Sequence, residues 1–293
     1  MRFFYGPRPH LDQMRREYES RCYSRIEVRP CNATIGAEIA GVQLAEVDDQ
    51  SFAEIEQAFL DYKVLFFRGQ QLDTASHLAF ARRFGELEEH PFLPTSGSDA
   101  ALVRFEKSEE VTGVENQWHT DVSWRERPAL GSLLRAIEVP PYGGDTLFAD
   151  MHAAYEGLPG KLRERVDGLE AIHDFSFSFG LALDPETKKQ RQQEFPPVAH
   201  PLVRTHPVTG KKALYACKVF TSHIVGLEPA ESHELLERLY DEATVPEYQC
   251  RFHWEADSVA LWDNRSVQHY ASNDYWPHRR VMERAAITGD RPV

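Results

Sequence analysis

The sequence contains few cysteines, and none of them belongs to a closely spaced pair. Its four cysteines, at positions 22, 31, 217 and 250 of 293, form no C-x-x-C motif. Zinc knuckles and disulfide scaffolds require such spacing or a higher density of cysteine, so neither is indicated. We expect four ordinary reduced thiols.

Long apolar runs are missing as well. Runs such as Val64-Leu65-Phe66-Phe67 fall far short of the roughly twenty apolar residues that a membrane-spanning helix needs. Residues 1–8 lack the longer apolar segment of a secretory signal peptide. These absences predict a cytoplasmic protein with no membrane partner.

Positive charge is in deficit. The chain carries 33 Lys and Arg residues against 46 Asp and Glu residues, which gives a formal net charge of −13. Such an excess of negative charge repels nucleic-acid phosphates, so we expect no nucleic-acid partner. Nucleotide hydrolysis is not indicated either, because the nearest match to a phosphate-binding loop, at 157–161, has the wrong spacing.

Apolar and aromatic residues, in contrast, are abundant. They make up 42% and 11% of the chain, which is enough for one large core. Short alternating segments between turn residues predict strands, whereas apolar residues at helical spacing predict helices. We predict strands over 24–29, 35–39, 63–67, 131–139, 146–149, 258–262 and 281–288, and helices after Asp48-Asp49, from Thr74, and over 153–169 and 231–242.

The order of these elements predicts a mainly β fold with flanking helices. A double-stranded β-helix, the jelly roll of cupin-like proteins, suits it. Residues 1–24 are mostly polar and are predicted to form an N-terminal arm, followed by a single domain over 25–293. We predict a lid around 175–197, because the stretch 184–193 carries charges with few apolar residues; the alternative is an ordinary surface loop, which composition alone slightly favours.

One histidine and one carboxylate stand at metal-ligand spacing. The triplet H-x-D occurs twice, and the copy formed by His119 and Asp121 lies in a β-like segment, 118–124, where both side chains would leave the same strand face. A second histidine from a distant strand would complete a 2-His-1-carboxylate triad, which leaves one face of an iron ion open for cosubstrate and oxygen. His269 is our candidate.

Two arginines follow the distal histidine. Arg280 and Arg284 are four residues apart, so in a strand they share a face. Buried unpaired charge is costly, and a guanidinium binds carboxylates by a two-donor fork, so two inward arginines beside a metal imply a dianion such as 2-oxoglutarate. The alternative is an exposed pair of arginines in surface salt bridges.

With these residues in view, the chain from about residue 25 to its C-terminus resembles the TauD/TfdA family of Fe(II)- and 2-oxoglutarate-dependent dioxygenases. The matching blocks, in order, are Phe84-Gly85-Glu86-Leu87, Trp118-His119-Thr120-Asp121, Gly143-Gly144-Asp145-Thr146, 200–207, Leu261-Trp262-Asp263-Asn264-Arg265 and Gln268-His269-Tyr270.

The resemblance implies a role for each site residue. Iron would be bound by His119, Asp121 and His269, with O₂ and 2-oxoglutarate as cosubstrates. The distal carboxylate of 2-oxoglutarate would be held by Arg280 and Thr146. Arg284, a further candidate for the cosubstrate, would with His90 face the anionic end of the substrate. The aromatic walls of the substrate pocket would be Phe179 and Phe220, although each alone is more often plain core.

Two positions depart from the taurine-specific pattern. Leu93 stands where taurine-specific members have tyrosine, and the asparagine that helps to bind the amine aligns with Glu115 or Asn116. The anion site is therefore kept, whereas the amine site is altered. A more apolar substrate tail is suggested by Leu93 and by Phe175, Phe177, Phe179 and Phe220. Alternatively, Glu115 recreates an ammonium site by its charge.

The sequence thus predicts an oxidoreductase that hydroxylates a C–H bond of a small anionic substrate, which is a sulfonate, a sulfate ester or a carboxylate. We expect a homo-oligomer, either a dimer or a tetramer. One alternative is a zinc hydrolase with the same His₂Asp ligands, which gives no reason for the two arginines and Thr146. Another is a metal-free binding protein on a jelly-roll scaffold.

Overall fold

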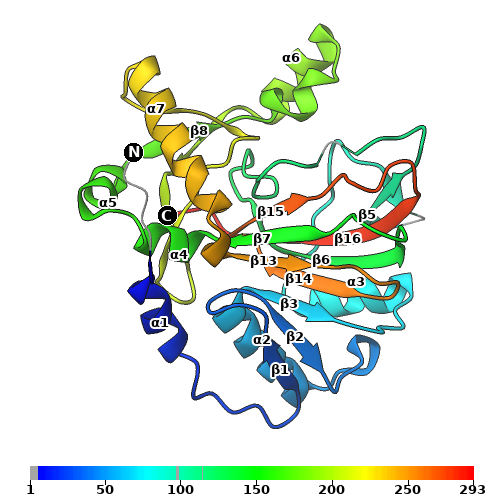
Figure 1. The fold of residues 1–293 in the computed structure, drawn as a ribbon. Coiled ribbons are helices and arrows are strands. Elements are labelled where there is room, and N and C mark those ends of the chain that lie inside the picture. The colour runs from blue at the N-terminus through cyan, green and yellow to red at the C-terminus, as the bar shows by residue number, and fades with distance from the viewer. Residues whose placement is uncertain (1–5, 97–98, 114) are drawn as a thin grey trace.

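The structure is a computed structural model that describes residues 6–96, 99–113 and 115–293, and its fold is organised around two facing β-sheets (Figure 1). In the larger sheet, β2 and β3 run parallel and the other neighbours pair antiparallel. Its eight strands, in spatial order, are β1 (Glu27–Pro30), β2 (Ala37–Ala40), β3 (Val64–Phe67), β14 (Val259–Asp263), β6 (Ala129–Glu138), β16 (Arg280–Thr288), β5 (Asp99–Lys107) and β4 (Thr95–Ser96).

The smaller sheet has three antiparallel strands, which are β13 (Gln249–Phe252), β7 (Thr146–Asp150) and β15 (Val267–Ala271). Strand alternation sends Val64 and Phe66 of β3 into the core between the two sheets. There Phe66 stacks on Phe252 of the smaller sheet, with ring centroids 4.1 Å apart. Two sheets packed face to face in this way form the jelly roll that the sequence predicts, and the prediction is confirmed.

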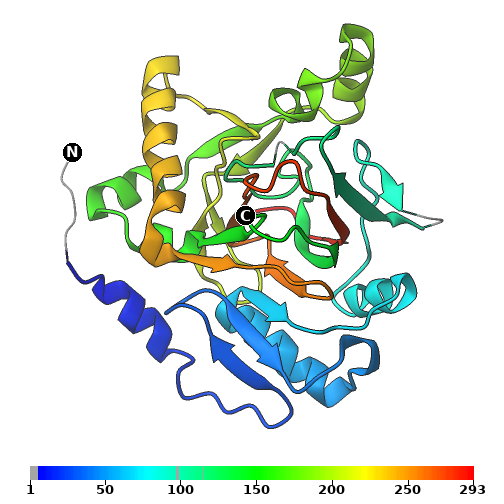
Figure 2. The same cartoon turned by 45° about the vertical axis from the view of Figure 1, so that its right-hand side comes forward.

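Two helices cover the outer face of the larger sheet (Figure 2). They are α2 (Asp49–Tyr62) and α3 (Thr74–Arg82). Helix α2 begins where the predicted cap is, because the Asp48 carboxylate accepts the Ser51 N–H at 2.7 Å. The alternate residues of β3, Leu65 and Phe67, point to this side and pack in the same cluster as the helices.

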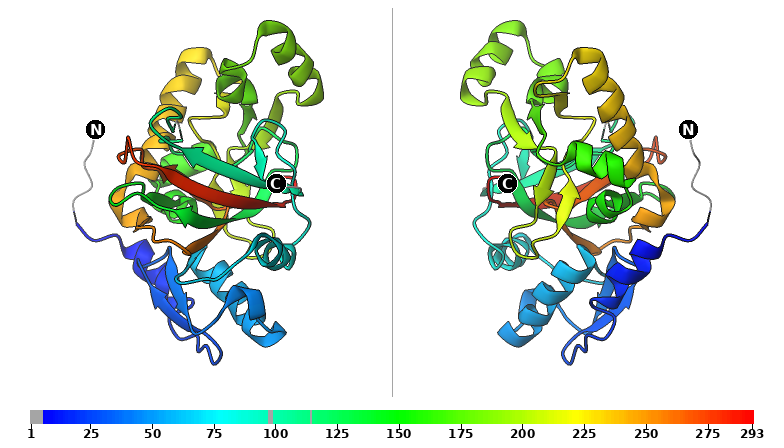
Figure 3. Two further views of the ribbon diagram at one scale, coloured as in Figure 1. Left: turned by 90° about the vertical axis from the view of Figure 1, so that its right-hand side faces the viewer. Right: turned by 90° about the vertical axis from the view of Figure 1, so that its left-hand side faces the viewer.

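A second helical layer closes one end of the molecule around a further core (Figure 3). Helix α6 (Pro185–Glu194) stands out from this end and buries none of its residues. The helices at this end are α1 (Pro9–Arg16), α4 (Met151–Glu156), α5 (Gly160–Val166) and α7 (Pro229–Tyr240). Two small sheets accompany them: β12 (Thr221–Ile224), β8 (Glu170–His173) and β9 (Val198–Pro201) form one, and β10 (Val203–Thr205) and β11 (Lys212–Leu214) form the other. Short 3₁₀ turns complete the chain at Leu44–Glu46, Phe175–Phe177, Phe179–Leu181, Asp241–Thr244 and Pro246–Tyr248.

The single helix that we predicted over 153–169 is wrong. The chain forms α4 and α5 instead, and the break falls at 157–159, just before and at Pro159. Proline has no N–H for the helical hydrogen-bond ladder, and its ring excludes the preceding turn, so a helix ends before it and a new one starts after it. The apolar spacing continued across the break because both helices pack on the same core.

Residues 1–5 of the predicted N-terminal arm lie outside the described residues. The part of the arm that follows contains α1, whose Leu11 and Met14 are buried against the core that also holds α4. The segment 175–197, which we interpreted as a lid or a loop, consists of two 3₁₀ turns and α6. Among the described residues, no helix is both long and apolar enough to cross a membrane.

Helix α3 joins the larger sheet through a buried histidine. The ring of His77 is fully buried, and its Nε2 lies 3.0 Å from the Leu133 carbonyl of β6, to which it donates. Burial lowers the pKa of His77 from 6.5 to about 4, against the effect of that hydrogen bond. The native protein therefore keeps this imidazole neutral at a pH where the unfolded chain protonates it.

We predict that acid destabilises the protein through this group. Because the pKa of His77 is lower in the folded state, its stabilising contribution is present above pH 6.5 and is lost as the pH falls towards 4. Between pH 7 and pH 5 the loss is about 2 kcal/mol for one such histidine. Denaturant unfolding at both pH values should show a smaller loss in His77→Gln. The same substitution at the exposed His233 controls for replacing a histidine, and an equal loss in both variants would contradict the prediction.

Candidate metal centre

Three potential ligands converge between the two sheets. His119 forms an isolated antiparallel bridge with His269 of β15, with N–H to carbonyl distances of 3.1 and 2.9 Å. This bridge brings the two imidazole centroids to 4.1 Å. The Asp121 Oδ1 atom lies 3.9 Å from the Nε2 atom of each imidazole. The three ligand atoms lie within 4.8 Å of one another, a spacing that suits one metal ion.

The strand that we predicted over 118–124 is wrong, although its two ligands do converge. After the single bridge at His119 the chain turns at 121–124, and Val122 has a left-handed φ of 47°. A β-branched residue seldom adopts such a φ, so the surrounding contacts must hold the turn. His119 and Asp121 therefore face the same point because of a tertiary turn, and the alternation of a strand plays no part.

The protonation states suit metal binding. Burial, together with the nearby His119, lowers the pKa of His269 to about 3, so this imidazole is neutral and keeps a free lone pair at neutral pH. Burial by itself would raise the pKa of the Asp121 carboxyl, but the guanidinium of Arg284 and the two imidazoles outweigh it and hold this pKa below its ordinary value. Asp121 also accepts from Arg284 Nη1 at 2.7 Å and from the Ser132 hydroxyl at 3.1 Å.

Arg280 indicates that an anion belongs beside this cluster. The side chains of Arg280 and Arg284 share the inner face of β16, as predicted, and both are buried. Among the described residues, Arg280 Nε and Nη2 have no hydrogen-bond partner, although both atoms are buried. Burial lowers the pKa of Arg280, against the opposing effects of Tyr275, Glu115 and Asp145. A bound carboxylate would remove this cost by a charge-assisted hydrogen bond.

The surroundings of Arg280 are shaped for a small dianion. Its guanidinium lies 5.9 Å from the ring centroid of Trp254, and the indole N–H of Trp254 donates to the Thr146 hydroxyl at 2.9 Å. Thr146 thus keeps its own proton for a further acceptor. Gly144 has a φ of 68°, and a Cβ there would come within 3.3 Å of Arg280 Nε, so glycine allows the close approach of this turn. The donor set fits 2-oxoglutarate.

His90 lies near Arg284, as we expected. The His90 Nδ1 atom accepts the backbone N–H groups of Phe92 and Leu93, each at 3.2 Å, so its proton resides on Nε2. Burial, with Arg284 and Arg125 nearby, lowers the pKa of His90 to about 3. His90 is therefore a neutral hydrogen-bond donor, and Nε2 is the atom that it can offer to an anion.

Aromatic rings surround His90. Its imidazole centroid lies 5.2 Å from that of Phe179, which in turn stacks against Phe220 at 6.1 Å. Phe175 is fully buried in the same apolar cluster. Our expectation for Phe177 is wrong, because its side chain is 55% exposed. The 3₁₀ geometry of this segment directs consecutive aromatic residues to different sides, which sequence spacing alone did not reveal.

The two candidates for an amine site differ in their surroundings. The Glu115 carboxylate lies 2.9 Å from Lys107 Nζ and is half-buried. Asn116 is exposed to solvent. An ammonium group at Glu115 would therefore have to compete with a lysine that is already paired there.

Sequence reasoning missed three polar residues of the site. Glu88 is buried, and burial raises its pKa although Arg125 lies 3.4 Å away and Arg284 is near. Ser132 and Asn264 both bind Asp121, through its carboxylate and its backbone respectively. Their positions in the sequence gave a signal for two of them. Glu88 precedes His90 by two residues, and Asn264 lies in the block Leu261-Trp262-Asp263-Asn264-Arg265 that matches the family.

A His₂-carboxylate cluster inside a jelly roll, beside a buried arginine whose Nε and Nη2 have no hydrogen-bond partner among the described residues, is typical of the non-haem iron(II) oxygenases that use 2-oxoglutarate. Residues 27–286 match the model of the family described as "Taurine catabolism dioxygenase TauD, TfdA family". The chain belongs to this family. It is accordingly an Fe(II)- and 2-oxoglutarate-dependent dioxygenase, and the zinc-hydrolase alternative finds no support.

Relatives of known sequence and structure agree with this assignment. The chain is 36% identical to an alpha-ketoglutarate-dependent sulfate ester dioxygenase of Pseudomonas putida, over 92% of this chain and 91% of that protein. It is 34% identical to an alpha-ketoglutarate-dependent 2,4-dichlorophenoxyacetate dioxygenase of Cupriavidus pinatubonensis, over 92% and 99%. A crystal structure of a taurine dioxygenase from Burkholderia xenovorans superposes with a TM-score of 0.80 at 39% identity, over 92% and 91% of the two chains.

We predict that alanine at His119, Asp121 or His269 abolishes turnover, because two remaining ligands hold Fe(II) too weakly. Succinate formation and Fe(II) content should be measured together. The matched control is Asp12→Ala, since Asp12 belongs to the other H-x-D triplet and its exposed carboxylate pairs with Arg15 and Arg16. A triad variant that binds stoichiometric iron and turns over would contradict the assignment.

Arg280→Ala should mainly weaken 2-oxoglutarate binding, because the metal ligands stay while the partner of the distal carboxylate is lost. We expect the half-saturating 2-oxoglutarate concentration to rise on the order of 30-fold or more, which corresponds to about 2 kcal/mol. Arg279→Ala is the control, because the neighbouring guanidinium is exposed and pairs with Glu106 and Glu138. Unchanged cosubstrate affinity in Arg280→Ala would assign the role to another residue.

Proposed function

We propose that this dioxygenase hydroxylates a C–H bond in a small sulfate ester, sulfonate or carboxylate whose tail is apolar. One observation carries the proposal: the donors Arg284 and His90 adjoin an aromatic wall that contains Phe179, whereas Glu115 is engaged by Lys107. Such surroundings favour a substrate with an anion at one end and hydrocarbon at the other.

The names of the relatives support the same substrate class. A sulfate ester and 2,4-dichlorophenoxyacetate, the substrates named for two of them, are each anionic at one end and carry no amine. Taurine, which gives its name to the family and to the crystal structure compared above, also carries an ammonium group. Leu93, in place of the tyrosine of taurine-specific members, offers that ammonium group no polar partner at this position.

In the proposed mechanism each residue has a separate task. Bound Fe(II) supplies the oxidising chemistry, which couples the conversion of 2-oxoglutarate and O₂ into succinate and CO₂ to the insertion of one oxygen atom into a C–H bond. His119, Asp121 and His269 would hold one face of the ion. Arg280 and Thr146 would orient the cosubstrate through its distal carboxylate.

The remaining residues would orient the substrate. Arg284 and His90 Nε2 would donate to its anionic group, so that the neighbouring carbon lies over the open face of the metal. The rings of Phe179 and Phe220 would exclude water from the tail. If the hydroxylated carbon carries a sulfate ester oxygen, the product collapses to an aldehyde and releases sulfate.

We also propose that the segment 175–197 acts as a lid. Two contacts of α6 support this: Gln192 donates to the Ser176 hydroxyl at 2.9 Å, and the Arg191 guanidinium lies 5.8 Å from the Phe92 ring of the aromatic cluster. The N-terminal arm, the single domain over 25–293, the dimer or tetramer, and the cytoplasmic location also remain proposals.

We predict that taurine is a poor substrate beside a short alkanesulfonate. A buried amine without a partner costs roughly 1–3 kcal/mol, so kcat/KM should favour the alkanesulfonate by about tenfold or more. Steady-state succinate formation with both substrates measures this ratio. If taurine wins by tenfold, the apolar assignment fails. Glu115→Gln would then test the ammonium role, because it should lower kcat/KM for taurine alone.

A further inference from the structure

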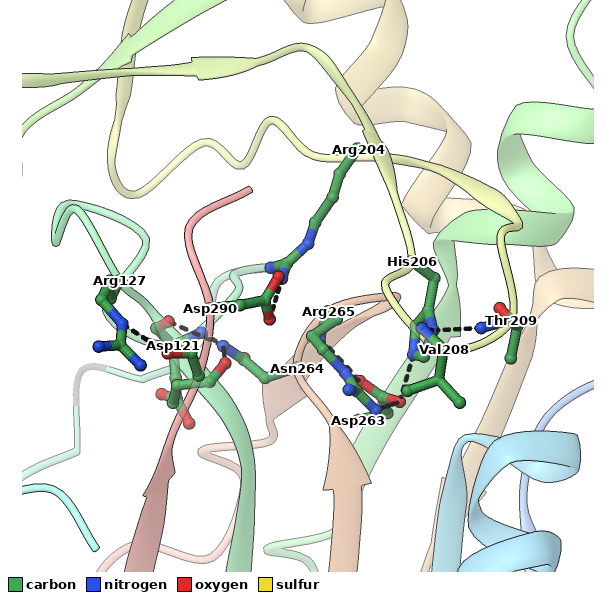
Figure 4. A network of polar contacts seen from close by, with 12 residues as sticks. Asp121, Arg127, Arg204, His206, Val208, Thr209, Asp263, Asn264, Arg265 and Asp290 are labelled. Carbon is green, nitrogen blue, oxygen red and sulfur yellow. Dashed lines mark hydrogen bonds and ion pairs between the residues drawn. The ribbon is translucent and has the colours of Figure 1, made fainter. Parts of the chain in front are cut away.

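The tight turn after β14 carries a buried asparagine that reaches across to a metal ligand. Asn264 is 1% exposed, and its side-chain amide makes three hydrogen bonds, all to backbone groups. Its Oδ1 accepts the Asp121 N–H at 2.8 Å, and its Nδ2 donates to the Asp121 carbonyl at 2.9 Å and to the Ala129 carbonyl at 3.0 Å. Both polar groups of the Asp121 backbone are thus satisfied by one side chain (Figure 4).

The turn that presents Asn264 is itself held by a buried ion network. The Asp263 carboxylate accepts from Arg265 Nε and Nη2, at 2.8 and 2.7 Å, and from His206 Nε2 at 2.9 Å. The proton of His206 must be on Nε2, because Nδ1 accepts the N–H groups of Val208 and Thr209. Figure 4 shows this network on the side of the turn away from Asp121. Asn264 therefore points towards Asp121, whereas its neighbours Asp263 and Arg265 belong to the ion network on the other side of the turn.

The network explains how the irregular segment 119–121 keeps its shape. One end is fixed by the bridge between His119 and His269, and the other end by the amide of Asn264. The left-handed Val122 follows directly, so the chain at Asp121 is a turn whose conformation needs an outside partner. Asn264 and His269 belong to one short segment, the turn after β14 and the β15 strand that follows it, so this segment sets the positions of both the carboxylate and the distal imidazole.

We propose that Asn264 is a positioning residue of the metal centre, which holds the Asp121 backbone so that the carboxylate faces His119 and His269 before the metal binds. The inference rests on the proposed metal site and adds to it a residue that touches neither metal nor substrate. Groups that orient a ligand typically account for 10–100-fold in metal affinity, which is the size of effect to expect here.

The chain offers a closely matched control. Gln70 is 3% exposed, and its side-chain amide also makes three backbone hydrogen bonds: it accepts from Leu44 N–H and donates to the carbonyls of Val42 and Arg68. Gln70 lies outside both the segment 119–121 and the segment 263–269. Gln70→Ala therefore removes the same number and kind of hydrogen bonds as Asn264→Ala, and its general destabilisation is comparable.

The experiment measures Co(II) and anaerobic Fe(II) binding to both variants by calorimetry, at a temperature where their melting curves show them folded. Asn264→Ala should lose 10–100-fold in affinity and show a smaller metal-induced rise in Tm, whereas Gln70→Ala should bind as the wild type does. If Asn264→Ala does not fold, Asn264→Asp supplies the measurement, because it keeps the shape and Oδ1 but lacks the donating nitrogen. The same direction of change is expected.

The results that would overturn the proposed function differ from those that would overturn only the positioning role of Asn264. Wild-type protein that binds no Fe(II) and consumes no 2-oxoglutarate would overturn the proposed function. Wild-type protein that binds normally, together with Asn264 variants that lose no more affinity than Gln70→Ala, would overturn the positioning role alone. Weakened metal binding in both Asn264→Ala and Gln70→Ala would also overturn it, because the effect would then follow general stability.

Discussion

The metal centre depends on the contact between two segments, 119–121 and 263–269. This contact includes the backbone bridge of two ligand histidines and the amide of Asn264 on the third ligand. Because β15 pairs with β7, and β14 lies inside the larger sheet, the segment 263–269 connects the two sheets of the jelly roll. The positions of the three ligands therefore depend on a few hydrogen bonds between this segment and the segment 119–121.

The two arginines of this centre differ in their partners. Arg284 pairs with Asp121 through Nη1 and has one buried donor atom, Nε, without a hydrogen-bond partner among the described residues, whereas Arg280 has two, Nε and Nη2. A protein seldom buries a cation without compensation, because the cost amounts to several kcal/mol. The Arg280 donors therefore suit a carboxylate of the cosubstrate, which would supply the hydrogen bonds that these atoms lack among the described residues.

On the proposed substrate side of the site, aromatic rings surround the hydrogen-bond donor His90. Around His90 the rings of Phe92, Trp124 and Phe179 approach within about 6.3 Å, and burial keeps its imidazole neutral. A neutral donor in an apolar wall can orient an anion without binding it so tightly that the product is retained. The positive charge of the proposed substrate site would come from Arg284, which also pairs with the metal ligand Asp121.

The sequence by itself determined the jelly roll, the helices on its outer face and the identity of the candidate ligands, because each depends on local spacing: alternation in β3 and β16, the Asp48 cap, and the H-x-D triplet with a distant histidine. Only the tertiary structure decided how the ligands meet. The turn at Asp121, the outward Phe177, the break before α5 and the reach of Asn264 to Asp121 across 143 residues arise from contacts between segments far apart in the chain, and no local pattern encodes such contacts.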